Sequence, residues 1–155
     1  MHIHKYERWW LTFGMGMLIV FLATIGFAAF ADNMNPPSGL RAIDPTKVSK
    51  TPPFDHPGLR RLPDGNYEAY YVAEVFSFVP ATITVPAGKN VTFYVTSPDV
   101  VHGFFIAKTD VNMMAVPGWV NSDSHVFRSK GTYLLICHEY CGIGHQNMFG
   151  KIVVK

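Results

Sequence analysis

The chain has 155 residues, of which 48% are hydrophobic and only 15% are charged. Soluble globular proteins carry charge on about 25% of their residues, so part of this chain is expected to lie in an apolar environment. The net charge of +2 gives no support for a nucleic-acid partner and provides only weak electrostatic steering toward a protein partner. The length allows one ordinary domain with a membrane appendage.

An uncharged apolar run covers residues 11–31, behind a short head at 1–10. As an α-helix this run would extend about 31 Å, enough to cross the hydrocarbon core of a bilayer. A cleaved signal peptide is the alternative. Its apolar core is typically about 7 to 15 residues long, however, and Trp9 and Trp10 stand where an interfacial aromatic anchor is expected. The sequence therefore predicts a single retained transmembrane helix at 11–31.

Basic residues predict the orientation of this helix. Lys5 and Arg8 precede it, whereas the first basic residue after it is Arg41, beyond Asp32. Cytoplasmic flanks of membrane helices carry the excess of Lys and Arg. We therefore expect a cytoplasmic N-terminus and a single pass, with the rest of the chain on the outer side of the membrane.

Residues 32–66 are rich in Pro, Gly and Ser, which predicts an extended tether rather than a packed element. From Tyr67 onward the pattern changes to short β-prone runs separated by turn residues. The runs lie at 67–78, 82–85, 91–97, 100–107, 124–129, 132–137 and 149–154. Seven short strands in roughly 90 residues predict a small antiparallel β-sandwich over 67–155, so the fold class is mainly β with one N-terminal transmembrane helix.

Both cysteines of the chain lie in one short segment near its C-terminus. Cys137, Cys141, His145 and Met148 give the spacing C-x3-C-x3-H-x2-M on the loop between the last two predicted strands. Two thiolates, an imidazole and a thioether form a soft ligand set. Such a set favours copper over magnesium, calcium or manganese.

A second imidazole is available upstream of this loop. His102 follows the expected strand 91–97, an arrangement like that of blue-copper proteins, in which an upstream His joins Cys, His and Met of a late loop. A mononuclear blue site needs only one Cys. The second thiolate therefore indicates a different arrangement, in which both sulfurs bridge two copper ions and the backbone carbonyl of Glu139 is a further candidate ligand.

Two other interpretations of the cysteines remain open. A disulfide is permitted on the oxidising side of the membrane, but a bridge between residues four apart in a tight loop is strained and leaves His145 and Met148 unexplained. Two Cys and two His also suit zinc, although zinc has little use for Met148. The other histidines are not expected to be ligands: His2 and His4 belong to the head, His56 to the tether, His125 to a strand, and His138 to a supporting or interface position.

From Tyr67 to Lys155, and less specifically through the membrane helix, the chain resembles subunit II of the haem-copper oxidases. The segments that carry the resemblance are SPDVVHGF and CHEYCGIGHQNMFG. The resemblance implies a cupredoxin-like sandwich that holds a dinuclear copper centre, CuA. It implies that both cysteines bridge the two coppers, that each histidine binds one of them, and that a thioether and a carbonyl complete the set: Cys137, Cys141, His102, His145, Met148 and Glu139.

The resemblance also implies a function. Cytochrome c, or another small redox protein, would give electrons to the copper pair, which would pass them to a haem in subunit I, where oxygen is reduced to water and protons are pumped. Asp99, three residues before His102, is a candidate to accept a hydrogen bond from a ligand imidazole. The alternatives are the CuA subunit of a nitric oxide reductase, a membrane-tethered copper carrier, and a docking module stapled by a disulfide.

The chain departs from the mitochondrial type of this family, which has two helices and a Trp-rich cluster. Here there is one helix, and the corresponding stretch reads AEVFSFVP. This combination is more similar to the B-type enzymes of prokaryotes, which implies a prokaryotic plasma membrane and leaves the second helix to a small additional subunit. The side chain of Glu139 is a candidate ligand for a magnesium ion shared with subunit I. Phe76, Phe78 and Trp119 are candidates either for a docking face or for the core.

Overall fold

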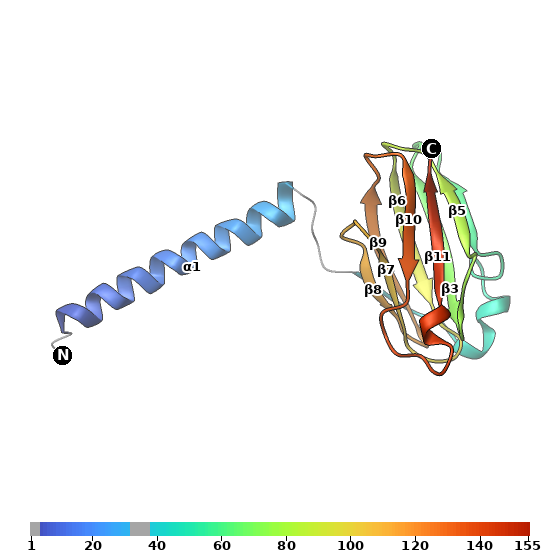
Figure 1. The fold of residues 1–155 in the computed structure, drawn as a ribbon, viewed down its shortest axis with the longest axis horizontal. Coiled ribbons are helices and arrows are strands. Elements are labelled where there is room, and N and C mark those ends of the chain that lie inside the picture. Colours follow the sequence, from blue (N-terminus) through green and yellow to red (C-terminus); the bar gives the residue numbers. More distant parts are fainter. Residues whose placement is uncertain (1–3, 32–37) are drawn as a thin grey trace. The chain divides into compact units, whose positions relative to one another are not determined.

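The computed structural model describes residues 4–31 and 38–155, which belong to two separate units (Figure 1). The first unit contains helix α1, Lys5–Ala31, which begins six residues before the predicted span. An 18-residue window of this helix has a mean hydropathy of 2.2, and its 27 residues are sufficient to cross a membrane; none of its side chains is buried. The predicted apolar helix is confirmed by length and composition.

The second unit, Pro37–Lys155, is a sandwich of two sheets (Figure 1). The six-stranded sheet has the order β1-β9-β6-β3-β2, and β4 pairs with β3. Its strands are β1 Ser38–Ala42, β2 Gly58–Arg61, β3 Tyr67–Glu74, β4 Ser77–Val79, β6 Asn90–Thr96 and β9 Trp119–Val126. The other sheet has the order β5-β11-β10-β7-β8, with β5 Thr82–Val85, β7 His102–Ile106, β8 Asn112–Ala115, β10 Gly131–Ile136 and β11 Phe149–Val154.

Alternating burial along the strands builds the core between the sheets. In β6, the side chains of Val91, Phe93 and Val95 are fully buried while the intervening ones are less so, because successive side chains of a strand point to opposite faces. Phe104 and Leu135 from the other sheet meet them in the same core. The sandwich is confirmed as mainly β.

Two of its pairings differ from the antiparallel pattern that the sequence predicts. Strands β3 and β6 run parallel, with Tyr67 opposite Val91, and β5 runs parallel to β11. Parallel neighbours need a crossover between them, and the chain makes both crossovers from one sheet to the other. Each sheet therefore contains both parallel and antiparallel pairs. The alternation of apolar residues within a strand does not determine which other strand becomes its neighbour, so the sequence pattern could not predict these pairs.

The segment predicted as an extended tether is largely packed onto the domain. Strand β1 pairs with β9, and β2 pairs with β3. Between them, the 3-10 helix Pro45–Lys50 is capped by the side chain of Asp44, and Val48 and Phe54 are buried against the outer face of the six-stranded sheet. The prediction of an unpacked tether is thus wrong for residues 38–61, because two apolar side chains and two strand pairings anchor a stretch whose composition is otherwise typical of a linker.

Candidate metal centre

The cysteine segment forms a closed loop at one end of the five-stranded sheet (bottom of Figure 1). Strands β10 and β11 pair in register up to Ile136 and Phe149, and the backbone N–H of Cys137 donates to the carbonyl of Met148 at 3.3 Å. Within the loop, a short 3-10 turn begins at His145. The pairing of β10 with β11 thus holds Cys137 and Met148, the first and last predicted ligands of this loop, opposite each other. The 3-10 turn reverses the chain between them.

The four side chains predicted from this loop converge. The Sγ atoms of Cys137 and Cys141 lie 3.9 Å apart, and Cys141 Sγ lies 3.5 Å from His145 Nδ1 and 3.7 Å from Met148 Sδ. The Sγ atom of Cys137 lies 3.2 Å from the carbonyl oxygen of Glu139. Both cysteines are free, with a sulfur separation almost twice the roughly 2.05 Å of a disulfide.

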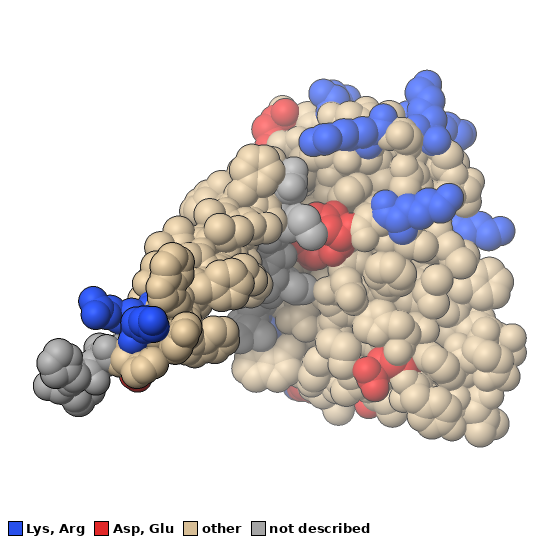
Figure 2. Space-filling model, turned by 60° about the vertical axis from the view of Figure 1, so that its left-hand side comes forward, with Lys and Arg blue, Asp and Glu red and all other residues tan. Residues whose placement is uncertain are grey.

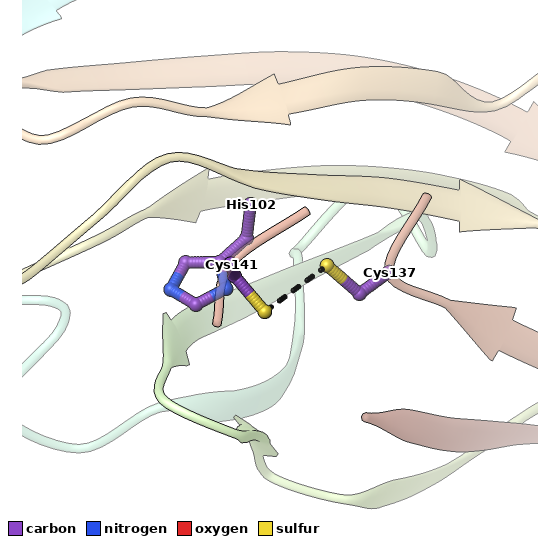
Figure 3. Close-up of side chains that lie close together, drawn as sticks. All are labelled: His102, Cys137 and Cys141. Atoms are coloured by element: carbon purple, nitrogen blue, oxygen red, sulfur yellow. Dashed lines mark hydrogen bonds between the residues drawn. The ribbon is translucent and has the colours of Figure 1, made fainter. Parts of the chain in front are cut away.

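His102 reaches the same place from the other predicted segment. It is the first residue of β7, which pairs with β10, and its side chain is fully buried. One ligand atom each from His102, Cys137 and Cys141 lie within 4.8 Å of one another, and Figure 3 shows the imidazole beside the two sulfurs. The pairing of β7 with β10 therefore brings together residues that are 35 positions apart in the sequence.

The two ring nitrogens of His102 differ in their surroundings. Nε2 lies 2.9 Å from Asp99 Oδ1, whereas Nδ1 is buried without a hydrogen-bond partner among the described residues. A buried polar atom without a partner costs about 1 to 3 kcal/mol. A metal ion beside the sulfurs would remove this cost, because neutral imidazole binds metals through an unprotonated nitrogen. The donor set therefore fits a soft metal.

Asp99 braces the loop that precedes His102. Its carboxylate accepts hydrogen bonds from the backbone N–H groups of Val75 at 2.8 Å and Val100 at 2.6 Å, and from Ser97 Oγ at 3.0 Å. Burial acts to raise the pKa of Asp99, but the hydrogen bonds from His102, Val75, Val100 and Ser97 outweigh it and hold this pKa below its usual value. The predicted hydrogen bond between Asp99 and an imidazole of the predicted ligand set, that of His102, is present.

The local electrostatics favour a neutral thiol at Cys141 in the absence of a metal. Burial, together with the neighbouring Cys137, raises the pKa of Cys141 to about 11. Thiolates and not thiols bind metals. Metal binding at this site must therefore displace protons and should become tighter as the pH rises.

Glycines allow two further close contacts that the sequence analysis did not identify. A Cβ at Gly103 would lie 2.7 Å from both the backbone N and Nδ1 of His138, whose Nε2 in turn lies 2.7 Å from Asn112 Oδ1. The ring of Phe76 lies where Cβ atoms of Gly142 and Gly144 would be. The sequence contained signals for this close packing: one glycine directly follows His102, and two glycines lie within the cysteine loop.

The remaining predicted residues lie as follows. Phe78 is buried in the core, Phe76 is half-buried, and Trp119 is 44% exposed, so Trp119 is not a core residue. The histidines not expected to be ligands have other partners: His56 bonds the carbonyl of Asp55, His125 bonds Asp110, and His138 bonds Asn112. His2 lies outside the described residues.

Comparison with known proteins agrees with this geometry. Residues 68–155 match the family model for the periplasmic domain of cytochrome c oxidase subunit II. A cytochrome c oxidase subunit 2 of Thermus thermophilus is 41% identical over 157 aligned residues, which cover 99% of this chain and 94% of that protein. A second Thermus thermophilus subunit 2 is 42% identical over 122 residues, covering 77% of this chain and 90% of its own length.

Solved structures show the same fold. A chain of a haem-copper terminal oxidase dimer matches with a TM-score of 0.78 and 30% identity, covering 97% of this chain and all of that one. The periplasmic domain of subunit II of the cytochrome oxidase of Bradyrhizobium japonicum shares the fold alone, with a TM-score of 0.53, 20% identity, and coverage of 57% and 83%. On the sequence match over the whole chain and the domain match over 68–155, the chain belongs to the cytochrome c oxidase subunit II family, whose members are subunits of a membrane-bound oxidoreductase complex.

Proposed function

We propose that this subunit accepts electrons from a small redox protein such as cytochrome c at a dinuclear copper centre and passes them to a haem in subunit I, for reduction of oxygen to water coupled to proton pumping. The proposed copper ligands are both thiolates, both imidazoles, the thioether and one carbonyl: Cys137, Cys141, His102, His145, Met148 and Glu139. The observation that carries this proposal is the buried Nδ1 of His102, which has no hydrogen-bond partner in the described part of the chain and lies beside the sulfurs of two free cysteines.

The protein supplies a site that changes little during electron transfer. When bound, the copper pair would provide a one-electron couple and would be held by the thiolates of Cys137 and Cys141 together with the other proposed ligands. His102, Cys137 and Met148 are almost completely buried, which excludes water, and the Cys137–Met148 backbone hydrogen bond fixes the distance between the ends of the loop. Ligands that are fixed in position, in surroundings that exclude water, minimise the change in bond lengths and solvent structure when the oxidation state of the metal changes.

The surface of the cysteine loop is suited to a partner that docks through apolar contacts. Tyr140, Ile143 and Phe149 are exposed, Ile143 to 88%, and residues 137–148 contain no lysine or arginine. Lysine and arginine side chains gather instead at the other end of the domain, where the C-terminus lies (top of Figures 1 and 2). This distribution supports docking of the electron donor, or of subunit I, at the copper end.

The membrane topology follows the basic residues of the head. We propose a cytoplasmic N-terminus and a periplasmic domain in the plasma membrane of a prokaryote, as in a B-type oxidase. The single helix and the absence of tryptophan from AEVFSFVP support the B-type assignment. A small additional helical subunit would occupy the position of the second helix.

Glu139 offers its two functional groups in different directions. Its carbonyl faces the Sγ atom of Cys137, while the residue as a whole is exposed. We therefore propose that its side chain supplies part of a magnesium site shared with subunit I. In the assembled oxidase, Glu139→Gln should reduce bound magnesium and leave the copper spectrum unchanged; a changed copper spectrum with intact magnesium would refute this division of roles.

The copper proposal is tested by loading the full chain in detergent with copper and recording the stoichiometry and the electron paramagnetic resonance spectrum. Two coppers per chain, with one unpaired electron shared by both nuclei, are expected. His125→Asn, which removes a histidine outside the site, is the matched control and should behave like the wild type. One copper with a single-nucleus pattern, one zinc bound in preference, or oxidised thiols without metal would each refute the proposal.

A further inference from the structure

Asp99 is the one carboxylate among the described residues that contacts a proposed copper ligand through its side chain. It lies in the connection between β6 and β7, and its side chain is 28% exposed. Four donors converge on it: His102 Nε2, the hydroxyl of Ser97, and the backbone N–H groups of Val75 and Val100. Its two oxygens are thus fixed by contacts with the turn between β3 and β4, with the connection between β6 and β7, and with the first residue of β7.

The contact with Asp99 determines which nitrogen of His102 can bind a metal. An ionised carboxylate only accepts hydrogen bonds, so the proton of a neutral His102 must reside on Nε2, at 2.9 Å from Asp99 Oδ1. The lone pair then resides on Nδ1, the buried atom for which residues 4–31 and 38–155 supply no hydrogen-bond partner. With the opposite tautomer, an N–H would point toward the sulfurs and a lone pair would face a carboxylate.

The same carboxylate ties His102 to a second loop of the site. Asp99 Oδ2 accepts the N–H of Val75, and the next residue, Phe76, lies with its ring against Gly142 and Gly144 of the cysteine loop. Movement of His102 away from the sulfurs would break its hydrogen bond to Asp99 or, if Asp99 moved with it, the hydrogen bond from Asp99 to the turn that packs on the cysteine loop. Asp99 connects the upstream ligand to the support of the downstream ligands.

We infer that Asp99 is a positioning residue that selects the Nδ1-binding tautomer of His102, fixes its ring, and lowers the reduction potential of the copper pair by placing a negative charge on the ligand's far nitrogen. The inference rests on the proposed copper function. The charge strengthens the imidazole as an electron donor, which stabilises the oxidised metal more than the reduced metal. Outer partners of this kind typically contribute about 10- to 100-fold to metal affinity.

Three variants distinguish the effect of the negative charge of Asp99 from that of its hydrogen bond to His102 and from a general effect on the fold. Asp99→Asn keeps the size and one acceptor oxygen but removes the charge, and Asp99→Ala removes the acceptor altogether. Asp64→Asn is the matched control, because Asp64 also accepts a backbone N–H and a side-chain N–H, both from Asn66, and lies in the loop before β3. Strand β3 separates that loop from Val75 by about 25 Å, at roughly 3.3 Å per residue.

The first readout needs no copper. In the metal-free full chain in detergent at pH 8, nitrogen-15 NMR should show His102 protonated on Nε2 in the wild type and in Asp64→Asn, and a mixture of tautomers in Asp99→Ala. The second readout is the reduction potential of the copper-loaded chain. Asp99→Asn should raise it by about 59 mV, which corresponds to a tenfold change in the relative affinity for the two oxidation states, while Asp64→Asn leaves it unchanged.

The outcomes distinguish the failure of this inference from the failure of the copper proposal. If the wild type and Asp64→Asn bind two coppers, but Asp99→Asn has the wild-type potential and Asp99→Ala the wild-type tautomer, Asp99 is only a structural brace and the inference is overturned. If neither the wild type nor Asp64→Asn binds two coppers, the copper proposal fails, and the tautomer measurement still decides the role of Asp99 toward His102. Should Asp99→Ala fail to fold, Asp99→Leu, which also lacks an acceptor but has a bulk closer to that of aspartate, supplies the tautomer readout, and Asp99→Asn still supplies the reduction potential.

Discussion

Replacing Gly103 by alanine should destabilise the domain by about 1 to 3 kcal/mol, the usual cost of inserting a methyl group into a packed interior. A Cβ there would lie 2.7 Å from the backbone N of His138, whereas ordinary contact begins at 3.4 Å, so the strands must separate locally by about 0.7 Å (3.4 minus 2.7). Strand β7 is paired with β8 on one side and β10 on the other, which leaves little room for that movement. The backbone of Gly103 itself does not require glycine, so crowding is the whole effect.

The assay is urea unfolding of the metal-free unit Pro37–Lys155 with its thiols reduced. His138→Ala in the Gly103→Ala background removes the imidazole but not the backbone N, and should restore only part of the lost free energy of unfolding. Gly144→Ala should also destabilise the domain, because its Cβ would lie 2.4 Å from Cδ2 and 2.5 Å from Cγ of Phe76, close to the base of that ring. A free energy for Gly103→Ala within 0.3 kcal/mol of the wild type, roughly the error of such measurements, would refute the claim that this glycine is sterically required.

Three other predictions use different parts of the domain. Phe54→Ala should lower the free energy of unfolding by about 3 kcal/mol because the ring is buried, whereas exposed Lys50→Ala changes little; equal, small effects in chemical denaturation would mean that residues 38–61 are an unpacked tether after all. Burial raises the pKa of Asp123 more than its backbone hydrogen bonds lower it, so its contribution to stability is complete below the unfolded pKa near 3.8 and is lost as the pH rises through the folded value. Asp123→Asn should therefore gain stability relative to the wild type as the pH rises above 3.8, measured by urea unfolding from pH 3.5 to 7; a constant difference would contradict this. Met148→Leu nearly conserves volume but removes the thioether beside Cys141, so voltammetry should show a shifted reduction potential with both coppers retained, and an unshifted potential would exclude Met148 as a ligand.

The part of the site formed by residues 137–148 could be predicted from the sequence, because its four candidate ligands lie in one loop. The spacing from Cys137 to Met148 places four soft donors within a single turn-and-ladder segment, and the structure brings these side chains together. His102 was identified by its place after a predicted strand, and the pairing of β7 with β10 explains why that position faces the loop.

The rest depends on contacts between distant segments, which no local pattern contains. The packing of residues 38–61 rests on two isolated apolar residues, Val48 and Phe54, which belong to no run of alternating or helically spaced apolar positions. The hydrogen bond from Val75 to Asp99 joins residues 24 positions apart, and that from His138 to Asn112 joins residues 26 positions apart. The parallel pairings of β3 with β6 and of β5 with β11 likewise follow from crossovers that only the assembled sandwich defines.

The packing of residues 38–61 also sets how far the domain can travel from its anchor. Only residues 32–37 separate Ala31, the end of the helix, from Ser38, the start of β1, so seven Cα steps limit that separation to about 25 Å. A free tether through residue 66 would have allowed roughly 120 Å. Because the effective concentration of two linked binding surfaces falls as the linker between them lengthens, the shorter linker raises it for a partner that binds both the helix and the domain of this chain.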